Sequence, residues 1–148
     1  MNRGGWNAER ITDQAGKIIV ITGASSGLGL EASTVLSAKG AKVIMAVRNL
    51  EKGKVAVSKI MNNNKNAHVE LMQVDLSDFN AIHAFSKEFH AKYTNLHILI
   101  NNAGIMYPKR REITKQGYES HWGTNHLGHF LLTGLMLDSL SEHLDPEW

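Results

Sequence analysis

A glycine-rich stretch, TGASSGLG at residues 22–29, has the composition of a loop that binds an anion through its backbone. An apolar, β-branched run precedes it and a helix-like segment follows it. The first N–H groups of a helix point outward and attract negative charge. A strand, a glycine loop and a helix in this order predict a dinucleotide site, and a glycine-rich turn without a ligand is the alternative.

Each part of this loop has a predicted task. Gly23 permits the tight turn, Gly27 lets a pyrophosphate approach the backbone, and Gly29 lets the helix pack closely on the strand. The hydroxyls of Ser25 and Ser26 add donors for phosphate. We therefore predict contacts to the cofactor from the whole loop: Gly23, Ser25, Ser26, Gly27, Leu28 and Gly29.

Four short apolar runs, at residues 17–21, 41–47, 68–76 and 96–100, alternate with longer amphipathic segments. Continuous β-branched runs of this length are typical of strands buried on both faces. Strands that alternate with helices predict an α/β fold: a Rossmann-type, doubly wound parallel sheet with helices on both faces, in three αβα layers. We expect about four strands, the N-terminal part of such a sheet.

The helical segments carry apolar residues at helical spacing, from which we predict their buried faces. The first helix is expected to bury Leu28, Ala32, Val35 and Leu36 and to end at Gly40, and the second to turn Val55 and Ile60 inward. Ser77 or Asp78 is expected to cap the third helix, whose core stripe is Phe79, Ile82, Phe85 and Phe89. A longer helix is expected between residues 114 and 140.

Composition narrows the classes of function. The 148 residues carry 16 basic and 14 acidic side chains, and a net charge of +2 is too small to argue for nucleic acid or an anionic membrane. There is no cysteine, no signal-peptide pattern and no apolar run long enough to span a bilayer. We expect a cytoplasmic protein, with peripheral membrane association left open. Residues 1–16 are predicted to be a polar extension and 17–148 a nucleotide-binding domain.

A second motif, NNAG at residues 101–104, follows the fourth apolar run. The spacing Gly-x-x-x-Gly-x-Gly together with this motif resembles the short-chain dehydrogenase/reductase family, over about residues 17–140. The resemblance implies that Asn102, Ala103 and Gly104 contact the cofactor. It also implies that Asp75, at the end of the third strand, contacts the adenine ring beside Leu76.

The end of the second strand decides between the two nicotinamide cofactors. A carboxylate there would bind the 2′-hydroxyl of NAD(H) but repel the 2′-phosphate of NADP(H). Here Val47 holds that position and Arg48 follows, and a guanidinium can bind a phosphate through two hydrogen bonds. We predict NADP(H) over NAD(H), and Arg48 as an ordinary solvated side chain is the alternative.

The stretch GTNHLGHFLLT, residues 123–133, contains Asn125. In the resembled family an Asn on this helix bends it locally through a water and continues the catalytic proton relay. This stretch and the stretch AVRNLEKG at residues 46–53 resemble the sequences of the retinol dehydrogenase, WW-domain oxidoreductase and protochlorophyllide reductase group. That implies a lipophilic alcohol or carbonyl substrate and homo-oligomer contacts through the Asn125 helix. His121, His126 and His129 lack a zinc-site pattern, so structural or substrate-side roles are expected.

The chemistry implied by the family is hydride transfer, with a Tyr as acid/base, a Lys four residues on and a Ser on the strand before them. No Tyr-x-x-x-Lys occurs here: Tyr107 is followed four residues on by Arg111, on the wrong element. We expect the missing residues to follow a fifth strand, so that the apolar fourth strand forms an exposed edge. The chain is expected to be the NADP(H)-binding portion of an oxidoreductase that holds nucleotide and catalyses poorly or not at all. A non-catalytic regulatory or dimerising module is the alternative.

Overall fold

The computed structural model describes residues 7–106 and 110–141 of the chain. A short 3₁₀ turn (Ala8–Arg10) precedes a four-stranded sheet with the strand order β3-β2-β1-β4, in which every pair is parallel. The elements follow in chain order as β1 (Ile18–Thr22), α1 (Gly27–Ala38), β2 (Lys42–Val47), α2 (Leu50–Asn63), β3 (His68–Gln73), α3 (Phe79–Lys92), β4 (Ile98–Ile100), the π-helical η2 (Trp122–Gly128) and α4 (His129–Ser141).

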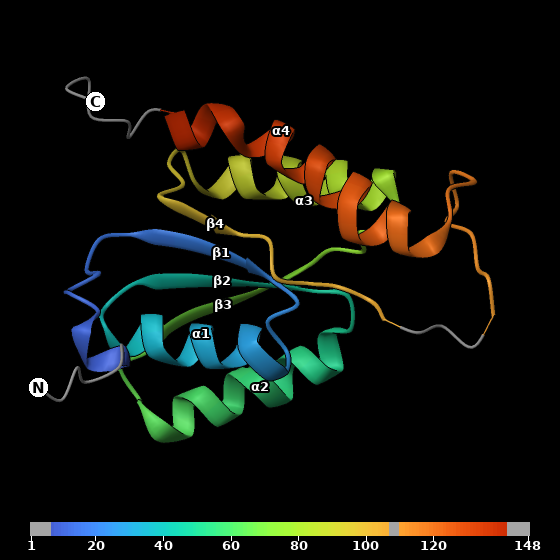
Figure 1. The fold of residues 1–148 in the computed structure, drawn as a ribbon. Coiled ribbons are helices and arrows are strands. Elements are labelled where there is room, and N and C mark those ends of the chain that lie inside the picture. Colours follow the sequence, from blue (N-terminus) through green and yellow to red (C-terminus); the bar gives the residue numbers. More distant parts are fainter. Residues whose placement is uncertain (1–6, 107–109, 142–148) are drawn as a thin grey trace, which may run out of the picture.

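Helices cover both faces of this sheet: α1 and α2 lie on one face, and α3 and α4 lie on the other (Figure 1). The predicted three-layer αβα architecture with four parallel strands is therefore confirmed. The connection from β3 returns past β1 to place β4 on the other side of the sheet, so the chain reverses its direction of growth between β1 and β4. At such a reversal the loops after neighbouring strands diverge and leave a crevice at the carboxyl ends of the strands.

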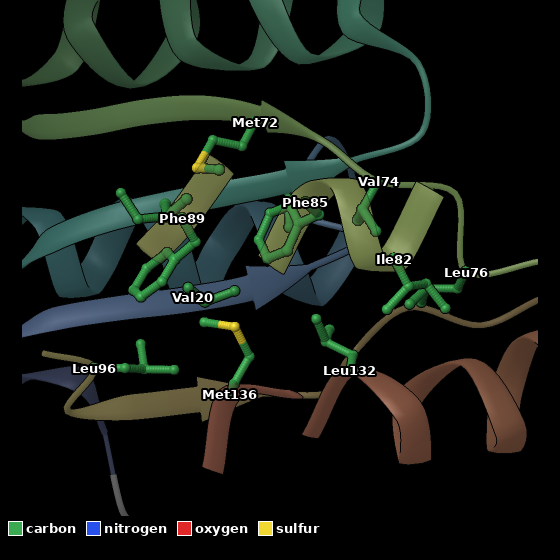
Figure 2. Packing of buried hydrophobic residues seen from close by; sticks show 12 residues of the cluster. Val20, Met72, Val74, Leu76, Ile82, Phe85, Phe89, Leu96, Leu132 and Met136 are labelled. Atoms are coloured by element: carbon green, nitrogen blue, oxygen red, sulfur yellow. The ribbon is translucent and has the colours of Figure 1, made fainter. Parts of the chain in front are cut away.

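The face of the sheet under α3 and α4 carries the larger cluster of buried side chains. Phe85 and Phe89 of α3 meet Leu132 and Met136 of α4 above Val20 of β1 (Figure 2). The predicted aromatic stripe is confirmed at Ile82, Phe85 and Phe89, whereas Phe79 is only partly buried at the margin of the cluster. These contacts hold both helices on the part of the sheet where β1 and β4 are neighbours.

The first helix packs on the sheet through small residues. Its fully buried positions are Gly29, Ser33 and Ser37, which recur every four residues. The sequence prediction for Leu28 was wrong in part: this side chain is 81% exposed. Because the small residues let α1 approach the strands closely, the bulky Leu28 is turned away from the core and toward the crevice.

The second helix shows the same effect, and the prediction that Val55 turns inward was wrong. Val55 is 72% exposed, while Gly53, Ala56 and Ile60 form the buried face. A Cβ at Gly53 would lie 2.5 Å from the Cδ1 atom of Leu71, so the helix sits almost in contact with β3. That approach selects the small-residue face of α2 and leaves the valine in solvent.

The helix ends follow the expected chemistry. Asp78 caps α3, because its carboxylate accepts a hydrogen bond from the backbone N–H of Asn80 (3.0 Å). Gly40 has φ = +93° two residues after the end of α1, which is the left-handed conformation that often ends a helix. None of the described helices has the length and apolarity needed to cross a lipid bilayer.

The core predicts the outcome of a paired substitution. Replacement of buried Phe85 by Ala should lower the free energy of unfolding by about 3–5 kcal/mol, because it removes a ring from a packed cluster. Val55→Ala should change it by no more than about 0.5 kcal/mol, because that side chain is already solvated. Urea denaturation followed by circular dichroism measures both, and equal losses would contradict the assignment of the two faces.

Candidate functional site

A groove of about 700 Å³ opens at the carboxyl ends of the parallel strands. Its walls come from the loops after all four strands and from the helix that carries Asn125. The described residues that line it are Thr22, Gly23, Ser25, Ser26, Gly27, Leu28, Ala46, Val47, Arg48, Asn49, Lys52, Val74, Asp75, Leu76, Asn102, Ala103, Gly104, Ile105, Met106 and Thr124. Apart from Gly29 and Asn125, every site residue predicted from the sequence is in this set.

The glycine loop has the shape that an anion site requires. Gly23 and Gly27 have φ values of +67° and +55°, a region that side chains with a Cβ rarely adopt. At Gly27 an added Cβ would meet open space, whereas at Gly29 it would lie 2.5 Å from the Asn102 side-chain nitrogen. Gly27 therefore faces the groove, and Gly29 serves the close packing of α1 that was predicted for it.

The first turn of α1 is open to a ligand. Ser26 occupies the N-cap position, yet its side chain makes no capping hydrogen bond, and the first turn carries no acidic residue. An α-helix leaves its first N–H groups without partners inside the helix, and these groups carry partial positive charge. The exposed hydroxyl of Ser26 and the N–H groups behind it are therefore available to an anion.

Thr22, the last residue of β1, joins the glycine loop to NNAG. Its hydroxyl oxygen accepts hydrogen bonds from the backbone N–H groups of Asn102 and Ala103, both at 2.9 Å. The Asn102 side chain donates a third bond to the Thr22 carbonyl (2.9 Å). These three hydrogen bonds hold the two glycine-containing motifs side by side. From the sequence, the motifs could be recognised only separately.

Two cationic side chains lie at the end of the groove nearest β2. The Arg48 side chain is exposed and makes no hydrogen bond or ion pair with the described residues, while its backbone carbonyl accepts a hydrogen bond from the Gln73 side chain (3.1 Å). Lys52, in the first turn of α2, lines the same wall. The nearest acidic residue in sequence, Glu51, forms an ion pair with Lys54 (2.7 Å). The sequence reasoning missed Lys52, although its spacing of four from Arg48 at a helix start was a usable signal.

The wall beyond β3 holds Asp75 and Leu76. Asp75 accepts hydrogen bonds from the Ser77 backbone N–H (2.9 Å) and hydroxyl (2.6 Å) through one carboxylate oxygen, Oδ1. Its other oxygen enters no hydrogen bond with the described residues, and Asp75 lines the groove. A few residues on, the Lys115 ammonium beside Asp78 holds the pKa of that carboxyl below its usual range and ties the loop before η2 to the start of α3.

Asn125 sits in the seven-residue π-helix η2, and the bend through a water at this residue stays a prediction. Two glycines allow η2 to lie directly on its neighbours: a Cβ at Gly123 would collide with Thr114, and one at Gly128 with the Leu76 carbonyl. The Asn125 amide accepts from the Ile105 N–H (2.8 Å) and donates to the Ile105 carbonyl (3.0 Å). Asn125 therefore holds the loop after β4 from behind the groove.

The three histidines near Asn125 have separate surroundings. His121 bonds Glu119 (2.9 Å), and the ring of His126 stacks between Trp122 and Phe130. His129 is buried, with one ring nitrogen on the Asn125 carbonyl (3.0 Å) and the other on the Thr22 hydroxyl (2.9 Å). No group of three metal-ligating side chains is present among residues 7–106 and 110–141.

Sequence reasoning left some features of this region unassigned. It did not find the Thr22–His129 contact or Thr124, which is buried at the groove wall. Thr124 and His129 belong to the segment 123–133, whose position depends on how η2 packs. Tyr107, considered above as a partner for Arg111, lies outside the described residues.

Comparison with known proteins identifies the family. Residues 17–144 match the short chain dehydrogenase family. The chain belongs to the short-chain dehydrogenase family. Mouse retinol dehydrogenase 12 is 48% identical over 130 residues, which are 86% of this chain and 40% of that protein. Human polyprenol dehydrogenase is 40% identical over 144 residues, 97% of this chain and 43% of that protein.

Solved structures of short-chain dehydrogenases and of uncharacterised proteins share the fold. An uncharacterised protein from Mycobacterium paratuberculosis is 41% identical, with a TM-score of 0.80 over 91% of this chain and 47% of that chain. A short chain dehydrogenase from Shigella flexneri in complex with NADP is 27% identical, with a TM-score of 0.71 over 85% of this chain and 54% of that chain. The family consists of oxidoreductases that bind nicotinamide cofactors, and this chain spans less than half of the two curated relatives.

We predict that the stability of the turn at the start of η2 depends on pH. Hydrogen bonds from the Trp122 backbone, then from the side chain and backbone of His121, lower the pKa of Glu119 to about 2, from an ordinary value of 4.5. Because the folded pKa is lowered, ionised Glu119 stabilises this turn fully above about pH 4.5, and the contribution is lost as the pH falls toward 2. Carboxyl NMR titration of Glu119 and hydrogen exchange at the Trp122 amide measure it.

The control for this titration is Glu119→Gln. It should abolish the acid-dependent rise in Trp122 amide exchange between pH 4.5 and 2, because no titrating carboxylate remains. A Glu119 carboxyl that titrates at its ordinary value would contradict the assignment of this cap.

Proposed function

We propose that this chain is the NADP(H)-binding portion of an oxidoreductase that interconverts an alcohol and a carbonyl by hydride transfer. The observation that carries the proposal is the charge pattern of the groove. At one end, the first turn of α1 carries no carboxylate. At the other end lie Arg48 and Lys52, and the nearby Glu51 carboxylate is paired with Lys54. That pattern suits a molecule with a pyrophosphate and a second, separate phosphate.

The residues present fit such a cofactor. Open space beside Gly27 and the free hydroxyl of Ser26 support a pyrophosphate at the start of α1. Asp75 and Leu76 line the groove just beyond β3, which supports a contact with the adenine at this wall. Asn102, Ala103 and Gly104 would continue the groove toward the nicotinamide. When bound, the nicotinamide supplies or accepts the hydride, and the side chains described here bind and orient it.

Preference for NADP(H) over NAD(H) rests on the wall after β2. The Arg48 guanidinium, just before α2, and the Lys52 ammonium, in its first turn, line the same wall and can bind a 2′-phosphate, and Val47 supplies no carboxylate that would repel it. The Shigella flexneri relative with bound NADP supports the same choice. The exposed Arg48 side chain is already free of competing partners among the described residues.

A lipophilic alcohol or carbonyl is the proposed substrate class. The chain is similar to a retinol dehydrogenase and to a polyprenol dehydrogenase, and retinol and polyprenol are lipophilic alcohols. Two exposed apolar side chains, Leu28 and Met106, at 81% and 79% exposure, lie on the groove wall and give it an apolar margin. A cytoplasmic location stays part of this proposal.

Self-association through the Asn125 helix is a second part of the proposal. Trp122, His126 and Phe130 stack along one side of η2 and α4, with ring centroids 4.3 Å and 6.4 Å apart. Leu137 extends this exposed stripe, and an added Cβ at the exposed Gly134 would meet open space. An aromatic stripe beside a glycine suits the close approach of a second copy of the same helix.

Nucleotide titration tests the cofactor assignment. The unsubstituted chain should bind NADPH more tightly than NADH, measured by isothermal titration calorimetry. Arg48→Ala and Lys52→Ala should each weaken NADPH binding by roughly 10–100-fold, the loss of a charge-assisted hydrogen bond, and leave NADH nearly unchanged. Lys54→Ala is the matched control, because Lys54 pairs with Glu51 and does not line the groove. An Arg48→Ala chain that binds NADPH and NADH as the parent does would refute the NADP assignment.

Sedimentation tests the proposed self-association. Phe130→Asp places a charge in the middle of the aromatic stripe and should shift the chain from dimer to monomer in analytical ultracentrifugation. Val55→Asp introduces the same charge at an equally exposed site on α2 and should leave the dimer intact. A parent chain that is monomeric at high concentration, or equal effects of both substitutions, would count against the stripe as the contact.

A further inference from the structure

The loop after β4 is held at both of its ends. At its start, the backbone N–H groups of Asn102 and Ala103 donate to the Thr22 hydroxyl. At its other end, the backbone of Ile105 exchanges two hydrogen bonds with the Asn125 amide. Gly104 lies between these anchors and faces the groove. A four-residue wall of the groove is thus positioned by one residue of β1 and one of η2.

His129 connects the two anchors. Its Nδ1 lies 3.0 Å from the Asn125 carbonyl, and its Nε2 lies 2.9 Å from the Thr22 hydroxyl. The His129 side chain is buried, and Thr22 is fully buried. Hydrogen bonds between buried groups resist displacement, because no water replaces a lost partner.

The partners of the ring allow one arrangement of protons on a neutral imidazole. A carbonyl only accepts, so Nδ1 must donate its hydrogen to Asn125. Nε2 then accepts the hydroxyl hydrogen of Thr22, whose other candidate acceptor, the Ile100 carbonyl, is farther away at 3.4 Å. The Thr22 oxygen meanwhile accepts from Asn102 and Ala103. Every hydrogen in this chain of contacts is accounted for.

We propose that His129 is a positioning residue of the nucleotide groove. As the Nδ1–H tautomer it joins Thr22 to Asn125, and so it places the segment 102–105 as one unit. The inference rests on the proposed function in one respect, that the groove binds a nicotinamide nucleotide. Loss of His129 leaves the two anchors to move separately, and the wall that Ala103 and Gly104 present to a ligand is no longer fixed.

The first measurement needs no substitution. Long-range ¹H–¹⁵N NMR of the histidine-labelled full chain reports which ring nitrogen carries hydrogen. We expect His129 to have a protonated Nδ1 and an unprotonated Nε2. A protonated Nε2 on a neutral ring would overturn the inference, whatever the chain binds.

The second measurement is the affinity for NADPH, combined with hydrogen exchange at the Ala103 and Ile105 amides. His129→Phe removes both ring contacts and should weaken NADPH binding roughly tenfold while it speeds exchange at both amides. If His129→Phe binds NADPH as tightly as the parent, or if its two amides stay protected, His129 is not a positioning residue.

His90 supplies a matched control for general stability. Its Nδ1 lies 2.8 Å from the Ser86 carbonyl and its Nε2 lies 2.9 Å from the Ser139 hydroxyl, so it makes the same two kinds of contact between α3 and α4. His90→Phe should lower the melting temperature yet leave NADPH affinity within about twofold, since it touches no groove residue. Equal losses of affinity in the two variants would overturn the inference.

These outcomes separate the two proposals. A parent chain that binds neither NADPH nor NADH refutes the proposed function, and the tautomer and amide exchange still decide on His129. A parent chain that binds NADPH while His129 carries hydrogen on Nε2 refutes only the positioning role. If His129→Phe does not fold, His129→Gln is the second variant, because its amide can still reach the Thr22 hydroxyl that Nε2 contacts. Hydrogen exchange in this variant should then speed up more at the Ile105 amide than at the Ala103 amide.

Discussion

The hydroxyl of Thr22 takes two backbone N–H groups from a loop that lies 80 and 81 residues further along the chain. It does so at the carboxyl edge of the sheet, where β1 and β4 are parallel neighbours. Without that oxygen two part-buried N–H groups would lose their partners, at a cost of up to about 1–3 kcal/mol each. The NNAG segment therefore lies beside the glycine loop, because the side chain of the residue that precedes this loop binds the NNAG backbone.

Close packing of α1 and α2 is the second condition for this groove. The helices meet the sheet through Gly29, Ser33, Gly53 and Ala56, and at Gly29 and Gly53 an added Cβ would lie within 2.5 Å of a neighbouring side chain. The start of α1 is thereby drawn over the end of β1, where its N–H groups face the groove. Larger side chains would hold α1 farther from the sheet, and its glycines would then lie too far from the groove formed at the strand ends.

The sequence was sufficient for the order of elements, the parallel sheet and most of the groove, because these depend on local patterns: β-branched runs, glycine spacing and Arg48 after a strand. It was insufficient where two elements meet. Val55 and Leu28 were predicted from apolar spacing to be buried, but the small residues beside them allowed a closer approach and turned them outward. The partnership of His129 with Thr22 spans 107 residues and has no local signature.

The charge of the groove shows why whole-chain composition is a poor guide to a binding site. A net charge of +2 gives no argument for a polyanionic partner, since it creates little field at long range. Within the groove, however, Arg48 and Lys52 lie on one wall and the start of α1 opens on another, while Glu51 is paired with Lys54. Screening reduces attraction only beyond about 8–10 Å, so charges gathered at this spacing act on a ligand that enters the groove. Selectivity for a nucleotide with a 2′-phosphate in addition to its pyrophosphate would then arise from the placement of two cations, with almost no contribution from the protein's total charge.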